Sequence, residues 1–394
     1  MVRRFYILMS IVLFLVAMPS CAQYFKLIGV QDGMPNSTVK ALVQDHRGFI
    51  WMGTFNGLCR YDGVSFITYR NVKGEGQSLS DSHIESLYPD RNGIWTGTVR
   101  GLDFLSFDDG RFHHACSGGK VIHESFLQLI HVQGRLIALT AAGNVFVQKS
   151  KYDFTNCFPS RHVRIRAIAA YKSHGVLMMS GKYLWIYDLK KRKVVSTIAI
   201  HLTEELNDEY ALYFSEKQNL VYVGFGINTP SLAFRVDSHL QLIPVKTYVP
   251  SSLKEVVDFD GATVFARDCE GLTILRNGKF QTFTPQNSSI SSDAIHSLLV
   301  DKEHNLWIGA YREGVNILTK RYSTFRSLSL ADSHLSSNVV TAVLERDGIV
   351  YVGTDGGGLN IYDRRTRRLE VLSTKRGNLP GDNVLSLSAD KDYL

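Results

Sequence analysis

The sequence predicts an all-β fold, a β-propeller of four-stranded antiparallel blades, and three observations carry this prediction. A motif that begins Trp51-Met-Gly-Thr returns at Trp95, 44 residues later, and the copies at Trp307 and Tyr351 are again 44 residues apart. A second motif, a polar loop between aliphatic residues, shares this period. The stretches between the motifs read as short alternating strands with glycine turns. A repeat in the forties with this make-up is typical of propeller blades.

The first 22 residues are expected to be an export signal and not part of the fold. A basic start at Arg3 and Arg4 precedes an apolar run, Phe5 to Ala17, which is shorter than the roughly 20 residues that span a bilayer. Ser20-Cys21-Ala22 offers a cleavage site. Cys21 leaves a lipidated N-terminus open as an alternative. Export and a periplasmic location are therefore expected.

Charge and cysteines narrow the classes of protein further. The net charge of +7 falls to +5 without Arg3 and Arg4, and much of the excess lies at 190–193 and 364–368. Both basic runs follow a Tyr-Asp pair, so we expect solvated hairpin tips of two blades and no nucleic-acid surface. The cysteines beyond Cys21 match no metal site or short disulfide framework, so neither a metal nor a cofactor is predicted.

The first blade can be followed strand by strand from its alternating apolar residues and its turns. Its predicted strands are Val39 to Gln44, Phe49 to Thr54, Leu58 to Tyr61 and Phe66 to Tyr69. Cys59 lies mid-strand and is expected to be a buried thiol. Between Trp95 and Trp307 the motif residues are no longer recognisable, but the apolar segments keep the same spacing. There, second strands are expected at Leu136–Leu139, Val176–Met179, Val221–Val223 and Val264–Ala266, and third strands at Val145–Val147, Leu184–Tyr187, Ala233–Val236 and Leu272–Leu275.

Counting these blades gives the predicted domains. Residues 23–324 are expected to form a seven-bladed ring, with Phe25-Lys-Leu-Ile28 as the outermost strand of blade 7, since closure leaves no exposed sheet edge. Residues 325–394 are then the first blade and a half of a second, truncated propeller. A single eight- or nine-bladed ring is the alternative, which the missing strands of the last blade disfavour.

The motifs of the first blade, Gly33-Met-Pro-Asn36, Gly48-Phe-Ile-Trp-Met-Gly-Thr54 and Tyr61-Asp-Gly63, resemble the two-component regulator propeller repeat. The resemblance is sharp in blades 1, 2, 7 and 8 and loose in blades 3 to 6. It implies the periplasmic sensor region of a Bacteroidetes hybrid two-component system histidine kinase. Members of this family typically carry two propellers, an immunoglobulin-like domain, a membrane helix and a kinase.

The resemblance also implies a role and partners. Many family members sense oligosaccharides released from glycans, so an oligosaccharide ligand, and self-association as a sensor dimer, are expected. No kinase motif and no second hydrophobic span is present in the sequence, so we expect a truncated product or a fragment that supplies the sensing end. Membrane attachment would then come only from a lipid anchor, the signal or a C-terminal continuation, and for a continued protein it would be the inner membrane.

Residues that recur in every blade are expected to be scaffold, and residues that break the pattern at exposed turns are candidates for function. Asp45 and its counterparts at turn starts are expected to be caps. The turn between the second and third strands lies on the same ring face as the loop between blades, around one mouth of the channel. Aromatic rings stack on sugars, and Arg and Asn bind hydroxyls or carboxylates. The predicted ligand-binding residues are Phe55, Asn56, Arg100, Tyr311 and Arg312.

Two other function classes stay open. A propeller glycosidase or polysaccharide lyase would require paired carboxylates at the mouth, and Asp268 with Glu270 is the one pair that shares a turn there. An interaction scaffold that docks a protein would need no small ligand. The prediction for this segment is a binding domain without catalytic residues.

Overall fold

The computed structural model describes residues 24–157, 163–172, 175–200, 210–246, 248–319, 334–390 and 393. These residues belong to two compact units, which divide between Lys320 and Arg321. The export signal predicted for residues 1–22 lies outside the described residues, as does the predicted boundary at residue 324. Within the described ranges, none of the helices combines the length and apolar character that a membrane crossing requires.

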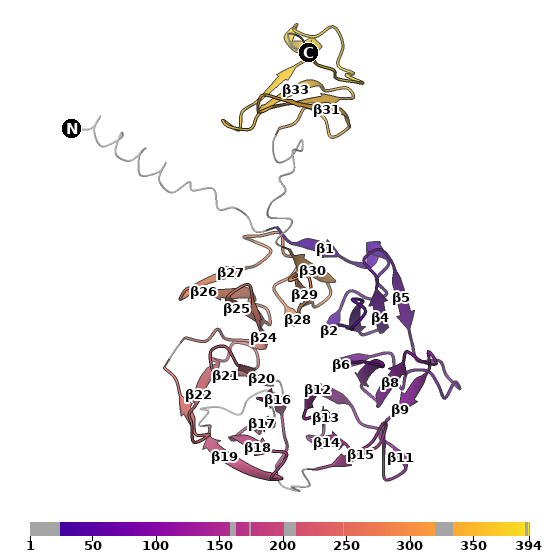
Figure 1. Ribbon diagram of the computed structural model, residues 1–394, viewed down its shortest axis with the longest axis vertical. Coiled ribbons are helices and arrows are strands. Elements are labelled where there is room, and N and C mark those ends of the chain that lie inside the picture. Colours follow the sequence, from indigo (N-terminus) through magenta and orange to yellow (C-terminus); the bar gives the residue numbers. More distant parts are fainter. Residues whose placement is uncertain are drawn as a thin grey trace, which may run out of the picture. The chain divides into compact units, whose positions relative to one another are not determined.

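The first unit contains seven four-stranded antiparallel sheets that follow one another around a central axis (Figure 1). Blade 1 is β2 (Val39–Gln44), β3 (Ile50–Thr54), β4 (Gly57–Tyr61) and β5 (Phe66–Tyr69). Blade 2 is β6 (Ile84–Asp90), β7 (Gly93–Thr98), β8 (Leu102–Ser106) and β9 (Phe112–His114). Blade 3 is β12 (Phe126–Val132), β13 (Arg135–Thr140), β14 (Val145–Gln148) and β15 (Phe154–Asn156). Blade 4 is β16 (Ala167–Tyr171), β17 (Gly175–Met179), β18 (Tyr183–Asp188) and β19 (Lys193–Ala199).

The remaining blades follow the same plan. Blade 5 is β20 (Tyr210–Ser215), β21 (Leu220–Phe225), β22 (Leu232–Val236) and β23 (Leu242–Pro244). Blade 6 is β24 (Leu253–Phe259), β25 (Ala262–Arg267), β26 (Gly271–Arg276) and β27 (Lys279–Phe283). Blade 7 is β28 (Ile295–Val300), β29 (Leu306–Ala310), β30 (Val315–Leu318) and β1 (Lys26–Ile28). Outside the blades lie the hairpin β10 (Cys116–Ser117) and β11 (Lys120–Val121), which the repeat did not predict, and the 3-10 turn η1 (Val30–Asp32). The all-β propeller fold predicted from the sequence is confirmed.

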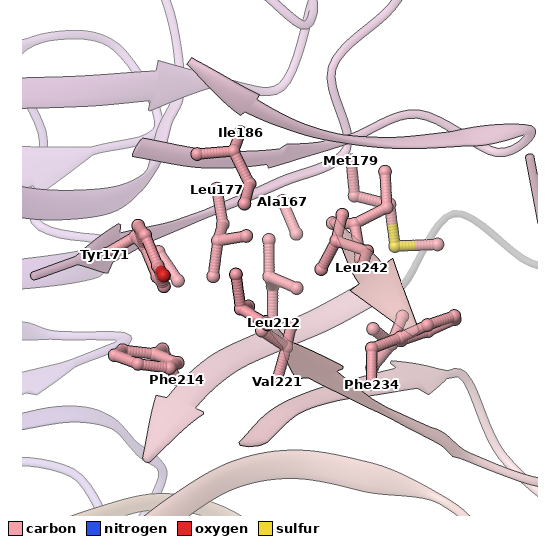
Figure 2. Packing of buried hydrophobic residues seen from close by; sticks show 14 of the residues in the cluster. Ala167, Tyr171, Leu177, Met179, Ile186, Leu212, Phe214, Val221, Phe234 and Leu242 are labelled. Atoms are coloured by element: carbon pink, nitrogen blue, oxygen red, sulfur yellow. The ribbon is translucent and has the colours of Figure 1, made fainter. Parts of the chain in front are cut away.

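The N-terminal strand β1 closes the ring. It pairs with β30 in the register Lys26↔Ile317 and Ile28↔Val315, which confirms the predicted donated strand. Seven buried apolar clusters join the seven neighbouring pairs of blades, including blades 7 and 1. Figure 2 shows the cluster between blades 4 and 5, where Leu177 and Ile186 approach Leu212 and Val221. The core is therefore a series of layers between sheets, and each layer buries the inner faces of two blades.

The repeated Trp-x-Gly-Thr motif has a separate structural reason at each position. A Cβ atom on Gly53 would lie 2.7 Å from Cγ2 of Ile84 in the next blade, so a side chain there has no room. The Thr54 hydroxyl donates to the carbonyl of Gly57 across the turn that follows, at 2.8 Å. Trp51 is buried, and its indole N–H donates to Asp45 at 3.0 Å. The motif is thus scaffold, as its recurrence predicted.

The second unit contains one four-stranded antiparallel sheet and the 3-10 turn η2 (Thr374–Arg376). The strands are β31 (Val340–Arg346), β32 (Ile349–Thr354), β33 (Gly358–Asp363) and β34 (Leu369–Leu372). A Cβ on Gly353 would lie 2.8 Å from Cγ1 of Val384, which repeats the contact between Gly53 and Ile84. We propose on this basis that residues after β34 begin a further blade.

Candidate functional site

The innermost strand of most blades is interrupted at its second residue. In β2, Val39 pairs with Thr54 and Ala41 with Gly53, so Lys40 is left without a partner across the ladder. The same shift of register occurs in β6, β12, β24 and β28. Such a β-bulge changes the direction of a side chain and is common beside binding sites. In blade 5, by contrast, Tyr210 pairs regularly with Phe225.

In five blades the bulged residue faces the channel, and blades 4 and 5 contribute Arg166, just before β16, and Tyr210, the first residue of β20. Together these residues form a ring at one mouth. We call them the throat ring: Lys40, Glu85, Leu127, Arg166, Tyr210, Lys254 and His296. Together with Gln128 and Leu253 they surround a cavity of about 210 Å³. A second cavity, of about 320 Å³, is lined by residues from the inner strands of all seven blades.

An aromatic cluster lies beside the throat ring on blades 7, 1 and 2. The ring centroid of Phe55 is 4.2 Å from that of His83 and 6.5 Å from that of Tyr311. Tyr311 stacks on His296 of the throat ring, with centroids 5.4 Å apart. The guanidinium carbon of Arg312 is 4.9 Å from the centre of the Tyr311 ring. We call Phe55, His83, Tyr311 and Arg312 the aromatic rim.

Contacts with carboxylates position four polar members of the throat ring, namely Lys40, Glu85, Lys254 and His296. Lys40 Nζ lies 3.5 Å from Glu85 Oε2, and His83 Nε2 lies 3.0 Å from Glu85 Oε1. Lys254 Nζ lies 3.1 Å from Asp268 Oδ2, and His296 Nε2 lies 3.9 Å from Asp268 Oδ1. A continuous set of contacts therefore runs along the mouth through blades 6, 7, 1 and 2.

The structure brings together three of the five residues predicted to bind ligand. Phe55, Tyr311 and Arg312 share the aromatic rim. Asn56 instead accepts hydrogen bonds from Arg70 Nε, to its backbone oxygen at 3.1 Å and its side-chain oxygen at 3.3 Å. The side chain of Arg100 is 77% exposed and pairs with Asp81 at 3.3 Å. Neither Asn56 nor Arg100 has a described contact with the rim.

The carboxylate pair considered for an enzyme is divided between two separate sets of partners. His296 and Lys254 hold the pKa of Asp268 well below its usual range, so this group stays ionised. Glu270 forms an ion pair with Arg267 and accepts a hydrogen bond from Ser251 Oγ at 3.0 Å. Neither arrangement supplies the protonated carboxyl that a glycosidase uses as its acid.

Glu255 and Cys59 are buried groups with shifted pKa values. Burial raises the pKa of Glu255, which lines the deeper channel, to about 7, although its hydrogen bond from the Leu298 N–H opposes this. Among the described residues, no group of three His, Cys, Asp or Glu side chains is arranged to hold a metal ion. Cys59 is a buried thiol, as predicted, and burial raises its pKa to about 12.

Sequence reasoning missed the whole throat ring, since none of its residues was among the predicted ligand-binding residues. Lys40, Glu85 and His296 directly follow the last aliphatic residue of the loop motif, and each differs from the others. A residue that changes from blade to blade between an aliphatic and a small neighbour was the available indication. The bulge that turns it toward the channel depends on strand pairing, which the spacing of motifs does not reveal.

The mouth can now be compared with known proteins. The sequence profile of a family described as "Two component regulator propeller" matches residues 33–56 and 289–312. Residues 33–56 and 289–312 are two-component regulator propeller repeats. They belong to blades 1 and 7, which meet where the ring closes. Each two-component regulator propeller repeat runs from the loop between blades through the bulged inner strand and the second strand. The two repeats end at Asn56 and Arg312, so they include both predicted aromatic residues of the rim.

Several solved structures resemble this chain over most of its length. The extracellular domain of a hybrid two-component system of B. thetaiotaomicron has 21% identity and a TM-score of 0.64, covering 94% of this chain and 51% of that one. Another extracellular domain from this organism has 17% identity and a TM-score of 0.60, with 94% and 51% coverage. A streptogramin B lyase has 10% identity and a TM-score of 0.57, with 75% and 97% coverage. The chain therefore spans about half of the two sensor structures. No curated protein sequence matches it significantly.

Proposed function

We propose that this propeller is the ligand-sensing part of an exported two-component signalling system and that its ligand is an oligosaccharide. The observation that carries the proposal is the aromatic rim, in which Phe55 and Tyr311 from two adjacent family repeats converge at the channel mouth. Two rings at an angle beside a polar cavity suit the apolar faces and hydroxyl edges of sugars. The likeness to extracellular domains of two-component systems supports both the sensing role and the location outside the cytoplasm.

Binding, without covalent chemistry, is enough for such a role. A ligand that prefers one arrangement of a sensor over another shifts the population toward that arrangement. The individually neutralised Asp268 and Glu270 support a binding site over a hydrolase. Regulation of glycan use by the complete system is part of the proposal.

Calorimetric titration of the full chain against a broad oligosaccharide panel tests the proposal. One structural family of oligosaccharides should bind, and Phe55→Ala or Tyr311→Ala should weaken that binding by about fivefold, since each stacked ring contributes about 1 kcal/mol. Tyr248→Ala is the matched control, because Tyr248 packs on Phe280 of the outermost strand β27, away from the rim. Flat titrations with folded protein, or release of cleaved sugar from the panel, would count against the proposal.

A further inference from the structure

The throat ring differs from the aromatic rim in its charge. Lys40, Arg166 and Lys254 contribute three permanent cations to one small cavity, and His296 adds an imidazole. Two carboxylates face these groups, namely Glu85 beside Lys40 and Asp268 beside Lys254. The mouth of the channel is therefore positive on balance, although each lysine has an acidic neighbour. A positive field at the mouth raises the local concentration of anions.

The cavity within the throat ring is too small for a long ligand but suits one acidic group. The cavity has a volume of about 210 Å³, which holds a small polar group and several water molecules. A carboxylate or sulfate with a few waters would occupy this space. The rings of the same ligand would then lie outside the cavity, where Tyr311 stacks on His296 and so joins rim to throat.

A buried polar atom of the throat ring has no hydrogen-bond partner within the described residues. It is Nδ1 of His296, whose side chain lines both channel cavities. Buried polar groups usually find partners, so such an atom indicates a missing ligand group or water. An imidazole that carries its hydrogen on Nδ1 is a suitable donor to an anionic oxygen beside the ammonium groups.

Other acidic groups of the channel do not cancel this preference. Glu255 lies deeper and accepts the N–H of Leu298 at 2.7 Å. Burial raises its pKa to about 7, so it adds little negative charge below neutral pH. The cations of the throat ring thus remain the dominant charges at the mouth.

We infer that the throat ring is a subsite for an anionic substituent, a carboxylate or a sulfate, on the oligosaccharide that the aromatic rim binds. The inference rests on the proposed function, because it assigns a chemical class to the ligand of the same mouth. It also gives the bulged position a function: the bulge directs Lys40, Lys254 and His296 into one anion site.

Matched pairs of oligosaccharides test this subsite. The full chain is titrated with oligouronides and sulfated oligosaccharides, each beside its carboxyl-reduced or desulfated counterpart. At least one acidic member should bind about 30-fold more tightly than its neutral counterpart, and its affinity should fall steeply with added salt. If the oligouronides bind, the natural acidic group is a carboxylate, and if the sulfated oligosaccharides bind, it is a sulfate.

Variants complete the test. Lys254→Met and Lys40→Met should each weaken the acidic ligand about tenfold and flatten its salt dependence, while the neutral counterpart is unaffected. Lys182→Met is the matched control, since Lys182 lies in a second-to-third-strand turn outside the throat ring. Melting temperatures confirm folding, and the smaller burial of Lys40 makes it the safer variant. Equal binding of neutral and acidic members, lost in Phe55→Ala but kept in both lysine variants, overturns the anion site and leaves the proposed function standing. No binding by any oligosaccharide overturns both.

Discussion

Blades 7, 1 and 2 follow the repeat motif closely, whereas blades 3 and 4 have lost it, yet both groups form the same four-stranded sheets. At the position of Gly53, which pairs with Ala41, blade 3 has Leu139 and blade 4 has Met179. The strands there still pair without the motif. The comparison shows that apolar alternation and strand pairing build a blade, and that the motif refines the contact with the next blade.

The throat ring follows a different rule. In blades 7, 1 and 2, which follow the motif closely, the throat-ring residue is His296, Lys40 and Glu85 in turn. The residue before it stays aliphatic, and the residue after it stays small. A bulged residue has no ladder partner to satisfy, so its side chain can change without loss of pairing. On the proposed function, scaffold and recognition are therefore encoded at adjacent positions of one strand.

The largest expected effect concerns the aspartate that anchors the motif in blade 1. Asp45 is fully buried and accepts the Trp51 indole N–H and the Phe49 N–H. Asp45→Ala should lower the free energy of unfolding by about 3 kcal/mol, because these donors lose their partner. Urea unfolding followed by tryptophan fluorescence measures this. Asp90→Ala in blade 2 is the control, with a loss below about 1 kcal/mol, since Asp90 caps the turn at Asn92 and is less buried.

The same aspartate also gives a dependence on pH. Burial opposes its ionisation, but hydrogen bonds from Trp51 and Arg47 outweigh this and lower the pKa of Asp45. A lowered pKa means that the stabilisation is present above the unfolded value, near 3.8, and is lost as the pH falls toward the folded value. Equal losses for Asp45→Ala and Asp90→Ala would contradict the distinction between the two blades.

A second substitution tests the contact between Gly53 of blade 1 and Ile84 of blade 2. Gly53→Leu introduces in blade 1 the residue type that Leu139 supplies in blade 3. The new side chain meets Ile84 of blade 2, so the free energy of unfolding should fall by about 2 kcal/mol. Gly76→Ala is the control, because a Cβ there has no atom within 4 Å. An unchanged urea midpoint for Gly53→Leu would mean that the motif glycine is not needed.

A smaller effect on stability is expected from a polar residue that differs between blades 2 and 7. Asp103 is buried and binds Ser80 and His114, whereas blade 7 has Asn316 bound to Ser291 at the same place. The hydrogen bond to Asp103 raises the pKa of His114, so this pair stabilises the fold below pH 6.5, and the stabilisation fades as the pH rises through the folded pKa.

Asp103→Asn copies blade 7 into blade 2 and should remove this dependence. The free energy of unfolding is compared at pH 6 and pH 8, and the difference between them should shrink by up to about 1 kcal/mol. His113→Gln is the control, because His113 pairs with the exposed Asp109. If the difference in unfolding free energy between pH 6 and pH 8 persists in Asp103→Asn, then groups other than Asp103 and His114 cause it.

The smallest effect extends the throat ring itself. Leu127 occupies the ring position of blade 3 and is partly exposed. Leu127→Lys adds a cation there, so affinity for an acidic oligosaccharide should rise about two- to threefold, or about 0.5 kcal/mol, without a change in stability. Calorimetry with the acidic and neutral pair measures it. An equal gain in affinity for the neutral oligosaccharide would show that the new lysine acts through a contact that does not depend on the ligand's charge.

The sequence predicted much of this fold for identifiable reasons. The second and third strands expected in blades 3 to 6, such as Val176–Met179, lie within observed strands, because alternating apolar residues report directly on burial. The hairpin β10–β11 was missed because it belongs to no repeat. Asp45 was expected only as a cap, since its bond to Trp51 depends on how the turn places both side chains.

The site was predictable only in part. The rule that turns of one kind share one face of a ring predicted that Phe55, Tyr311 and Arg312 lie together, and they do. Asn56 and Arg100 met the same rule, but neighbours at Arg70 and Asp81 engage them, and such contacts are set by tertiary structure. Five members of the throat ring lie at a register shift between strands, which no linear motif encodes.

Hydrogen–deuterium exchange of the full chain, with and without the oligosaccharide that binds in calorimetry, tests the central claim most directly. Ligand should protect peptides at the mouth, covering residues 54–57, 82–86, 294–297 and 310–313. Peptides of the opposite turns, 45–49 and 301–305, should exchange as before. Protection of those opposite turns, with the mouth unchanged, would contradict a ligand site at the aromatic rim.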